Sequence, residues 1–325
     1  MPAVDIVYLT FRADPAFGWF ADGLARQLRP GDDVRVIVVD GHHGPPERAE
    51  LFAHAAADRF ALTHVAPKPT PYAGPHRRTP SDLFCAANAR NTGIVWSTAP
   101  YVVFADDCSV PMPGWLAAVR AAATDGYVVA GAYGKHWEMV VRSGELVSSR
   151  ATSAGRDHRW DLGADDRVVP IRGAQLFGCS FGAPRDLFVR LNGQDELCDP
   201  SGGEDYAFGL RVEHAGEPIF YDRALFTVES EELHRTNDVV LRVDRAVDDA
   251  RYLELLRSFG ADARTTTGAR DASHLVLDVL LGTRAIRALG NAFDLARLRP
   301  EDLPALADAL PDRYWLDDTP LAELA

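Results

Sequence analysis

Two adjacent carboxylates, Asp106 and Asp107, are the residues whose position most clearly suggests chemistry. They directly follow the short β-branched and aromatic run Tyr101–Ala105. Such a run is typical of a strand buried on both faces of a parallel sheet. In open α/β sheets, ligands bind just beyond the carboxyl ends of the strands. We therefore expect the pair to stand where a substrate is held, and the alternative is a solvated turn or a helix N-cap.

The elements that must position this pair alternate between strands and helices. A second apolar run also ends in a carboxylate, at Asp40. Alternation of this kind predicts an α/β fold with a mostly parallel sheet and right-handed crossovers. The predicted strands are 5–11, 34–40, 62–65, 101–105 and 127–132, and the predicted helices include 17–28, 46–59 and one that opens at Trp115.

A further helix leads into the strand that carries the aspartates. Thr79 is its predicted N-cap, with proline next and Asp82 at the third helical position. Asn88, Arg90 and Asn91 cluster within one turn of it. These polar side chains either face solvent, which is the usual case, or line a cleft beside Asp106.

A second acidic pair, Glu204 and Asp205, opens another predicted helix that ends near Gly216. The helix macrodipole favours carboxylates in a first turn, which is also the purely structural explanation for them. Between the two pairs lies an irregular region, 134–169, which predicts a hairpin around Ser143–Gly144. Long irregular insertions in compact domains are commonly binding loops or lids.

Bulk composition excludes some classes of protein. The 325 residues carry a formal net charge of -13, which argues against a sequence-independent grip on DNA or RNA. The four cysteines are far apart and form neither a zinc pattern nor a redox pair, so we expect free thiols. No signal peptide or transmembrane span is visible, and we expect a cytoplasmic protein, with the inner face of the membrane as a peripheral location.

The pattern changes beyond about residue 238. Amphipathic helices are predicted at 239–259, 272–289 and 301–310, joined by polar or Gly/Pro breaks. We therefore expect two parts, a domain over 1–237 and a helical C-terminal extension over 238–325. The extension is expected to pack against the first domain, and the alternatives are a homo-oligomer interface, a lid or a surface for membrane-bound acceptors.

Taken in order, several segments resemble the GT-A fold nucleotide-sugar glycosyltransferases, specifically the large inverting family 2. The resemblance covers roughly residues 3–236, and no single segment decides it. The segments are Val38–Asp40, Ala89–Ile94, Phe104–Pro111 with Trp115, Gly202–Asp205, and the acceptor-side stretches Gly178–Arg185 and Leu191–Glu196.

The resemblance implies roles on the donor side of the site. Asp40 would accept a hydrogen bond from the nucleobase, favouring UDP- or dTDP-sugars. Asp106 would contact the ribose or the metal, and Asp107 would bind a Mn²⁺ or Mg²⁺ ion on the diphosphate. His234 is the proposed second metal ligand, with an ordinary surface histidine as the alternative. Further nucleotide-sugar contacts are expected from Thr10, Arg12 and Arg90.

On the acceptor side, the resemblance makes Asp205 the general base that deprotonates the attacking hydroxyl. Glu204 would raise the pKa of Asp205 by repulsion or bind the acceptor. Cys108 departs from the family pattern, which usually has a third carboxylate there, and we interpret it as a small apolar filler. The expected acceptor contacts are Trp115, Trp137, Gly178 and Cys179.

Other functions remain open at this stage. The partners expected for a transferase are a nucleotide-sugar donor and a glycan, lipid-linked or small-molecule acceptor. The main alternative is a GT-A-like protein that binds nucleotide sugars, or serves as a scaffold, without catalysis. A nucleotidyltransferase needs a glycine-rich phosphate loop, which Thr10–Asp14 is not, and the dinucleotide-binding glycine pattern is also missing after the first strand.

Overall fold

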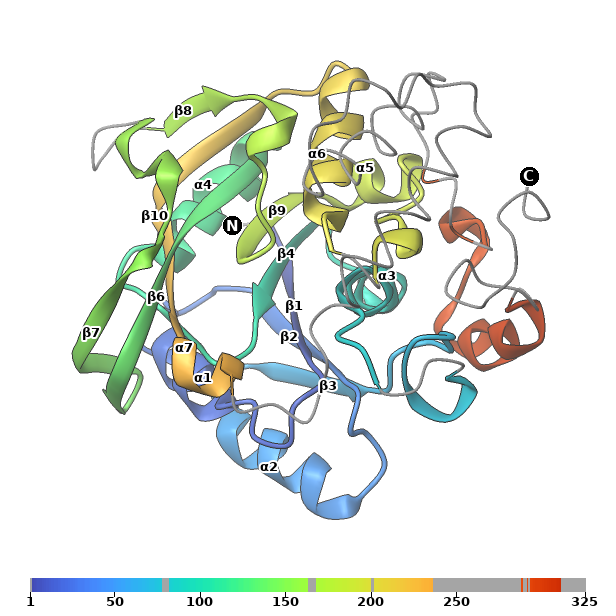
Figure 1. Ribbon diagram of the computed structural model, residues 1–325, viewed down its shortest axis with the longest axis horizontal. Coiled ribbons are helices and arrows are strands. Elements are labelled where there is room, and N and C mark those ends of the chain that lie inside the picture. Colours follow the sequence, from blue (N-terminus) through green and yellow to red (C-terminus); the bar gives the residue numbers. More distant parts are fainter. Residues whose placement is uncertain are drawn as a thin grey trace.

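The computed structural model describes residues 2–77, 82–162, 168–199, 202–235, 288, 291 and 293–310. Within these ranges ten strands form one sheet (Figure 1). Its strand order is β3-β2-β1-β4-β9-β6-β10-β5, with β7 paired to β6 and β8 paired to β10.

The first half of the sheet is parallel and carries the candidate residues at its strand ends. It consists of β1 (Val4–Thr10), β2 (Val34–Asp40), β3 (Ala61–Val65) and β4 (Tyr101–Asp106). In the register of these strands Thr10 pairs with Asp40, and Leu9 pairs with Asp106. The carboxyl ends of three neighbouring strands therefore bring their polar side chains to one edge of the sheet.

The second half mixes strand directions. β9 (Ser180–Pro184) runs antiparallel between β4 and β6 (Val128–Arg142), and β10 (Ile219–Ser230) is parallel to β6. The short strands β5 (Ser109–Pro111) and β8 (Val168–Ile171) pair antiparallel with β10. The predicted α/β class, with a mostly parallel sheet flanked by helices, is confirmed.

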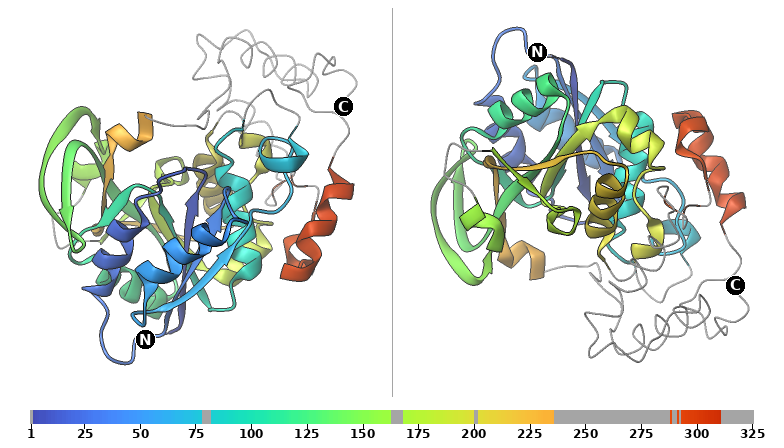
Figure 2. Two further views of the ribbon diagram at one scale, coloured as in Figure 1. Left: turned by 90° about the horizontal axis from the view of Figure 1, so that it is seen from below. Right: turned by 90° about the horizontal axis from the view of Figure 1, so that it is seen from above.

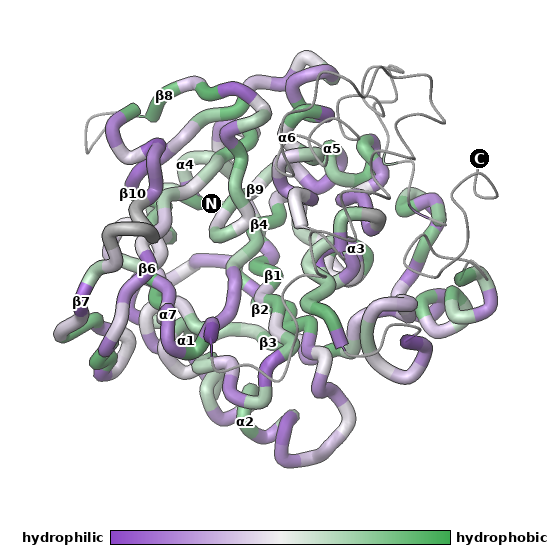
Figure 3. The backbone as a smooth tube through the Cα atoms, in the orientation of Figure 1, coloured by the Kyte–Doolittle hydropathy of each residue, from purple (hydrophilic) through white to green (hydrophobic). Residues whose placement is uncertain are grey.

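Helices cover both faces of the sheet because the strand side chains alternate between them. Ile6 and Tyr8 of β1 face one apolar cluster, whereas Val7 and Leu9 face the other. The strands at the centre are largely hydrophobic (Figure 3). The first cluster is covered by α1 (Phe17–Ala25), α2 (Pro46–Ala56) and α4 (Trp115–Asp125), and the second by α3 (Ala86–Trp96), α5 (Arg185–Arg190) and α6 (Glu204–His214).

Helix α3 begins later than the sequence predicted. Its first residue is Ala86, whereas Thr79 lies outside the described residues and Asp82 instead accepts a hydrogen bond from the backbone of Gly74. The cap comes from Asp199, which accepts from the backbone N–H groups of Ala87 at 2.7 Å and Asn88 at 3.1 Å. A cap supplied from so far along the chain leaves no local signal, so this prediction was wrong.

The predicted hairpin is present and is longer than expected. β6 and β7 (Glu145–Arg156) meet at Ser143 and Gly144, which both have positive φ, 47° and 72°. Two successive residues with positive φ give the backbone twist that suits a tight hairpin. The ribbon extends from the sheet at the left of Figure 1.

The remaining elements are short. They are η1 (Gly74–His76), η2 (His158–Leu162), η3 (Gly173–Gln175), η4 (Glu196–Cys198), α7 (Glu231–Arg235), η6 (Leu295–Arg297) and η7 (Pro300–Ala309). The last two belong to the predicted C-terminal extension and pack on the cluster that holds α3 and α5. The predicted helices 239–259 and 272–289 fall almost wholly outside the described residues, and the boundary at 237/238 stays a prediction.

The described residues form neither a membrane-spanning helix nor a disulfide bond. None of their helices has the length and apolar character needed to cross a membrane. All four cysteines are buried and carry free thiols, as the sequence predicted. Burial raises the pKa of the Cys108 and Cys179 thiols well above their ordinary value, because a buried thiolate loses its hydration.

Gly93 allows α3 to pack closely on β1, and this contact yields a stability prediction. A Cβ atom at Gly93 would lie 2.3 Å from Cγ1 of Val7. We expect Gly93→Ala to lower the free energy of unfolding by about 1–3 kcal/mol, because overpacking forces a shift of helix or strand. Thermal and urea unfolding measure it. Gly18→Ala is the matched control, since no atom lies within 4 Å of its Cβ position; equal stability of the two variants would contradict the prediction.

Candidate active site

Arg90 stands at the centre of the candidate site and is 1% exposed. Its Nη2 atom donates to Oδ1 of Asp106 at 3.0 Å, and its Nη1 atom donates to Oε1 of Glu204 at 2.6 Å. The two acidic pairs that the sequence singled out are thus joined by one guanidinium group. Of the two alternatives for Arg90 and its polar neighbours on α3, the structure shows the buried one, beside Asp106.

Asp205 is held beside this centre by the backbone. Its Oδ2 atom accepts from the N–H of Gly178 at 2.6 Å, and its Oδ1 atom accepts from the N–H of Tyr206 at 2.7 Å. Burial and then repulsion from Glu204 raise the pKa of Asp205 to about 6, against the lowering effect of Arg90. A carboxylate with this pKa is suited to accept a proton near neutral pH.

Asp106 keeps part of its side chain accessible, with 20% of it exposed. Burial raises its pKa to about 8, with Arg90 acting in the opposite direction and Glu229 and Asp107 adding repulsion. Asp106 is therefore the member of the first pair that offers a surface to a ligand, whereas the Asp107 side chain is 1% exposed.

Asp107 has both carboxylate oxygens engaged. Thr10 donates its hydroxyl to Oδ2 at 2.7 Å, and Arg12 donates its Nε–H to Oδ1 at 2.8 Å. Arg12 also reaches α7, where Nη1 donates to the carbonyl of Leu233 and Nη2 lies 3.3 Å from Nδ1 of His234. Since arginine only donates, the Nδ1 atom of His234 accepts this bond.

These contacts decide whether the expected Mn²⁺ or Mg²⁺ ion fits. Arg12 contacts both predicted ligands, with its Nε–H on Oδ1 of Asp107 and its Nη2 beside Nδ1 of His234, so a positive charge already stands between them. Burial, followed by the positive charges of Lys135 and Arg12, lowers the pKa of His234 to about 3. Within the described ranges no three His, Cys, Asp or Glu side chains are grouped to hold a metal. In this arrangement the residues do not fit a divalent cation.

Asp40 is also fully paired within the protein. Arg48 donates to both of its oxygens, at 2.8 and 3.0 Å, while Nε2 of His64 and the backbone N–H of His42 supply the other two bonds. Burial alone would raise its pKa, but the bonds from His64 and Arg48 bring it to about 2. A base contact through Asp40 requires one of these donors to leave.

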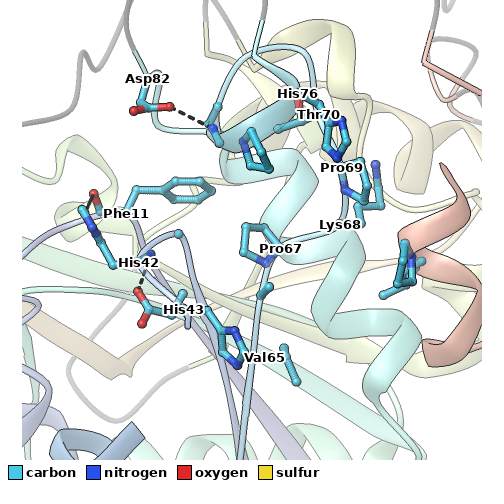
Figure 4. A pocket seen from close by; sticks show the side chains of 18 of the residues that line it. Phe11, His42, His43, Val65, Pro67, Lys68, Pro69, Thr70, His76 and Asp82 are labelled. Atoms are coloured by element: carbon cyan, nitrogen blue, oxygen red, sulfur yellow. Dashed lines mark hydrogen bonds between the residues drawn. The ribbon is translucent and has the colours of Figure 1, made fainter. Parts of the chain in front are cut away.

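A cavity of about 730 Å³ opens beside Asp40, beyond the carboxyl ends of β2 and β3. Figure 4 shows its lining, with Phe11 and His42 on one side and Pro67 and Lys68 on the other. Its walls combine proline, phenylalanine and imidazole rings with a few polar groups. Ligand sites are typically concave, largely apolar and of this size.

Trp115 does not belong to an acceptor site. Its side chain is 0% exposed, its ring packs edge-on against Phe20, and its indole N–H donates to Ser180 at 3.2 Å. The expectation that it contacts an acceptor is therefore corrected: Trp115 is a core residue that ties α4 to β9. Large aromatic side chains bury well where their N–H finds an acceptor.

The other expected acceptor residues lie at different depths. Gly178 is at the centre, because its N–H binds Asp205 and its carbonyl accepts from Arg90 at 3.0 Å. Cys179 is buried, with 7% of the residue exposed. Trp137 lies on β6, half-buried, with the guanidinium of Arg235 5.0 Å from its ring centre.

Sequence reasoning missed three residues that organise the site. Arg48 binds Asp40 and also donates to the backbone carbonyls of Arg12 and Ala13, both at 2.6 Å, which fixes the loop after β1. Gln194 accepts from Arg90 at 3.3 Å, and His64 binds Asp40. Arg48 and His64 lie in no motif, whereas Gln194 lies within the stretch Leu191–Glu196 without having been singled out there.

Comparison with known proteins gives distant matches, and no family model matches the chain. A validoxylamine A glucosyltransferase from Streptomyces hygroscopicus subsp. limoneus is 25% identical over 273 residues, which is 76% of this chain and 56% of that protein. A pre-mycofactocin glycosyltransferase from Mycobacterium tuberculosis is 34% identical over 96 residues, or 30% of this chain and 17% of that protein.

The chain resembles glycosyltransferases over about three quarters of its length. It spans only about half the length of the first of these curated relatives and less of the second. Among solved structures, a mannosyltransferase from Pyrobaculum calidifontis in complex with GDP-Man and Mn²⁺ is similar. The alignment covers 99% of this chain and 78% of that chain. That alignment has a TM-score of 0.46 and 21% sequence identity.

The position of Arg12 generates a metal-binding prediction. In Arg12→Gln, the carboxylate of Asp107 and the Nδ1 atom of His234 lose the guanidinium that engages them. We expect this variant to bind Mn²⁺ at least about tenfold more tightly than the unchanged protein, because the repulsion of a nearby positive charge is removed; calorimetry or electron paramagnetic resonance in the presence of UDP measures it.

The control for this experiment is the double variant Arg12→Gln with Asp107→Asn, which should lose the new binding. Because Arg12→Gln leaves a buried carboxylate without its cation, its stability is expected to fall by about 3–5 kcal/mol, so its melting is recorded in parallel. Equally tight binding of Mn²⁺ by the unchanged protein would show that Arg12 does not block the site.

Proposed function

We propose that the protein is an inverting glycosyltransferase that transfers a sugar from a nucleoside diphosphate sugar to an acceptor hydroxyl. The observation that carries the proposal is the bridge that Arg90 makes between Asp106 and Glu204. It puts a donor-side carboxylate and the acidic start of α6 into one buried cluster at the edge of the sheet. The resemblance to glycosyltransferases supports the same reaction class.

The donor is placed across the carboxyl ends of the parallel strands. The nucleobase enters the cavity beside Asp40, and the diphosphate passes the loop that holds Thr10 and Arg12. The sugar then reaches Asp106, the accessible member of its pair. UDP and dTDP are the proposed nucleotides, because Asp40 would accept a hydrogen bond from the ring N–H of uracil or thymine in place of one of its present donors.

The reaction is a displacement at the anomeric carbon. The acceptor oxygen forms a bond to that carbon while the bond from the carbon to the diphosphate oxygen breaks, and the hydroxyl proton passes to Asp205. Gly178 and Tyr206 orient the Asp205 carboxylate through their N–H groups. Arg90 holds Glu204 in place beside Asp205. The repulsion from Glu204 that raises the pKa of Asp205 is therefore built into the site.

We assign no step to a divalent cation. A Mn²⁺ or Mg²⁺ ion at Asp107 and His234 would compete with Arg12, which contacts both side chains. Among the described residues, Arg12 and Arg90 are the positive charges beside Asp107 and Asp106. Two of the five N–H groups of Arg12 have no partner among the described residues, and we propose them as donors to a phosphate oxygen.

A second candidate function is a protein that binds a nucleotide sugar without transferring it. The extensive internal pairing of Asp40 and Asp107 favours this alternative, because paired carboxylates are less available to a ligand. Metal-independent release of nucleotide from a panel of UDP-, dTDP- and GDP-sugars would decide between the two functions, since a binding protein gives tight binding and no release.

Asp205→Asn tests the assignment of the general base. The amide keeps the size of the side chain and retains an acceptor oxygen for the N–H of Gly178, but it takes up no proton. We expect nucleotide affinity within about twofold of the original and a fall in transfer rate of about 10²–10⁴-fold. Calorimetry with UDP and a nucleotide-release assay measure the two quantities. Retained turnover would place the base elsewhere.

The raised pKa of Asp205 predicts a pH profile. Asp205 acts in its deprotonated form, so its titration should make kcat/KM decline as pH falls through about 6, reaching a slope of about tenfold per unit. The low residual activity of Asp205→Asn should lack this acidic limb. A limb that persists unchanged in the variant would assign the titration to another group.

A further inference from the structure

One side of the cavity beside Asp40 is built by the C-terminal segment. Pro300, Leu303 and Pro304 of η7 line it, and we refer to these three residues as the C-terminal wall. In both views of Figure 2, η7 (red) lies beside the loop that follows β3 (cyan), and it borders the cavity at the right of Figure 4. The C-terminal wall lies far from the strand ends in sequence. A ligand that fills this cavity would nevertheless contact it.

The C-terminal wall is packed firmly against the domain. Leu303 is 5% exposed and belongs to the apolar cluster that also contains the core residues of α3 and α5. Phe293, which precedes η6, lies under the ammonium group of Lys68, with 4.4 Å between Nζ and the ring centre. Lys68 lines the cavity as well. The C-terminal segment is therefore held against the domain at two points, Leu303 and Phe293.

Hydrogen bonds hold the same segment to the loop that supports Arg90. The Asn192 side chain accepts from the N–H of Leu295 at 2.7 Å and donates to the carbonyl of Phe293 at 3.0 Å. Asn291 donates to the carbonyl of Gln194 at 2.9 Å, and the Gln194 side chain accepts from Arg90. The C-terminal wall therefore has a defined position relative to the candidate active site.

The distance across the sheet suits an extended donor. The cavity lies at β2 and β3, whereas Asp106 ends β4, two to three strands away in the order β3-β2-β1-β4. Neighbouring strands lie about 4.8 Å apart, which makes this span roughly 10–14 Å. A nucleotide sugar has comparable reach between its base and its anomeric carbon, so the base is the part that meets the C-terminal wall.

We propose that the C-terminal wall packs against the flat face of the nucleobase and sets the size of base that the protein accepts. This inference rests on the proposed function, because it takes the ligand to be a nucleoside diphosphate sugar. Proline and leucine side chains offer a flat apolar surface without hydrogen-bonding groups, which selects by shape. The buried side chain of Leu303 limits the depth of the cavity, and Pro304 stands at its exposed rim.

The experiment compares the affinities for UDP, dTDP and GDP by calorimetry, with melting temperatures measured on the same samples. Leu303→Ala deepens the cavity and should shift the ratio of GDP to UDP affinity towards the purine by roughly tenfold. Leu295→Ala is the matched control, because Leu295 is a leucine of the same segment with 4% exposure that does not line the cavity. It should leave the ratio unchanged.

A second pair of variants avoids the loss of buried apolar surface. Pro304→Trp, at an exposed position that lines the cavity, should weaken binding of all three nucleotides by at least about tenfold, because the indole fills the rim. Ala305→Trp, exposed and outside the lining, should bind like the original.

The outcomes separate this inference from the function on which it rests. If the unchanged protein binds a nucleotide and the Leu303 and Pro304 variants match their controls, the role of the C-terminal wall is overturned while the proposed function stands. If the unchanged protein binds none of the three nucleotides, the proposed function fails, and this inference fails with it.

Discussion

The structure depends on neutralising carboxylates that are buried at the carboxyl ends of parallel strands. An isolated buried carboxylate is too costly to keep ionised, so each one needs a partner. Three arginines from different elements serve this purpose: Arg48 binds Asp40, Arg90 binds Asp106, and Arg12 binds Asp107. Each guanidinium also binds further groups. The same contacts therefore neutralise the carboxylates and hold the segments of the site together.

This arrangement explains what the sequence predicted well. The limits of β2 were predicted residue for residue, and α4 was expected to open at Trp115, because apolar runs and proline or glycine breaks report local structure. Asp40 and Asp106 were predicted at the ends of strands in a mostly parallel sheet, and they stand at the carboxyl ends of β2 and β4. Periodicity and fold class were sufficient for both.

What the sequence did not predict involves partners distant along the chain. The engagement of Asp107 by Arg12, and of Arg12 by α7, combines three segments that no spacing rule connects. Trp115 was misplaced for a related reason: a tryptophan beside an acidic motif has the same sequence signature whether it stacks on a sugar or packs on Phe20. Only three-dimensional packing distinguishes these cases.

The cap that Asp199 provides for α3 has a consequence for the order of folding. The first two N–H groups of α3 past its opening residue are satisfied by this one side chain, which lies in the second half of the chain. During synthesis, the parallel strands and the sequence of α3 emerge well before Asp199 does. The cap of the helix that carries Arg90 therefore forms only after Asp199 has been synthesised, so the N-terminus of α3 depends on the segment between α5 and α6.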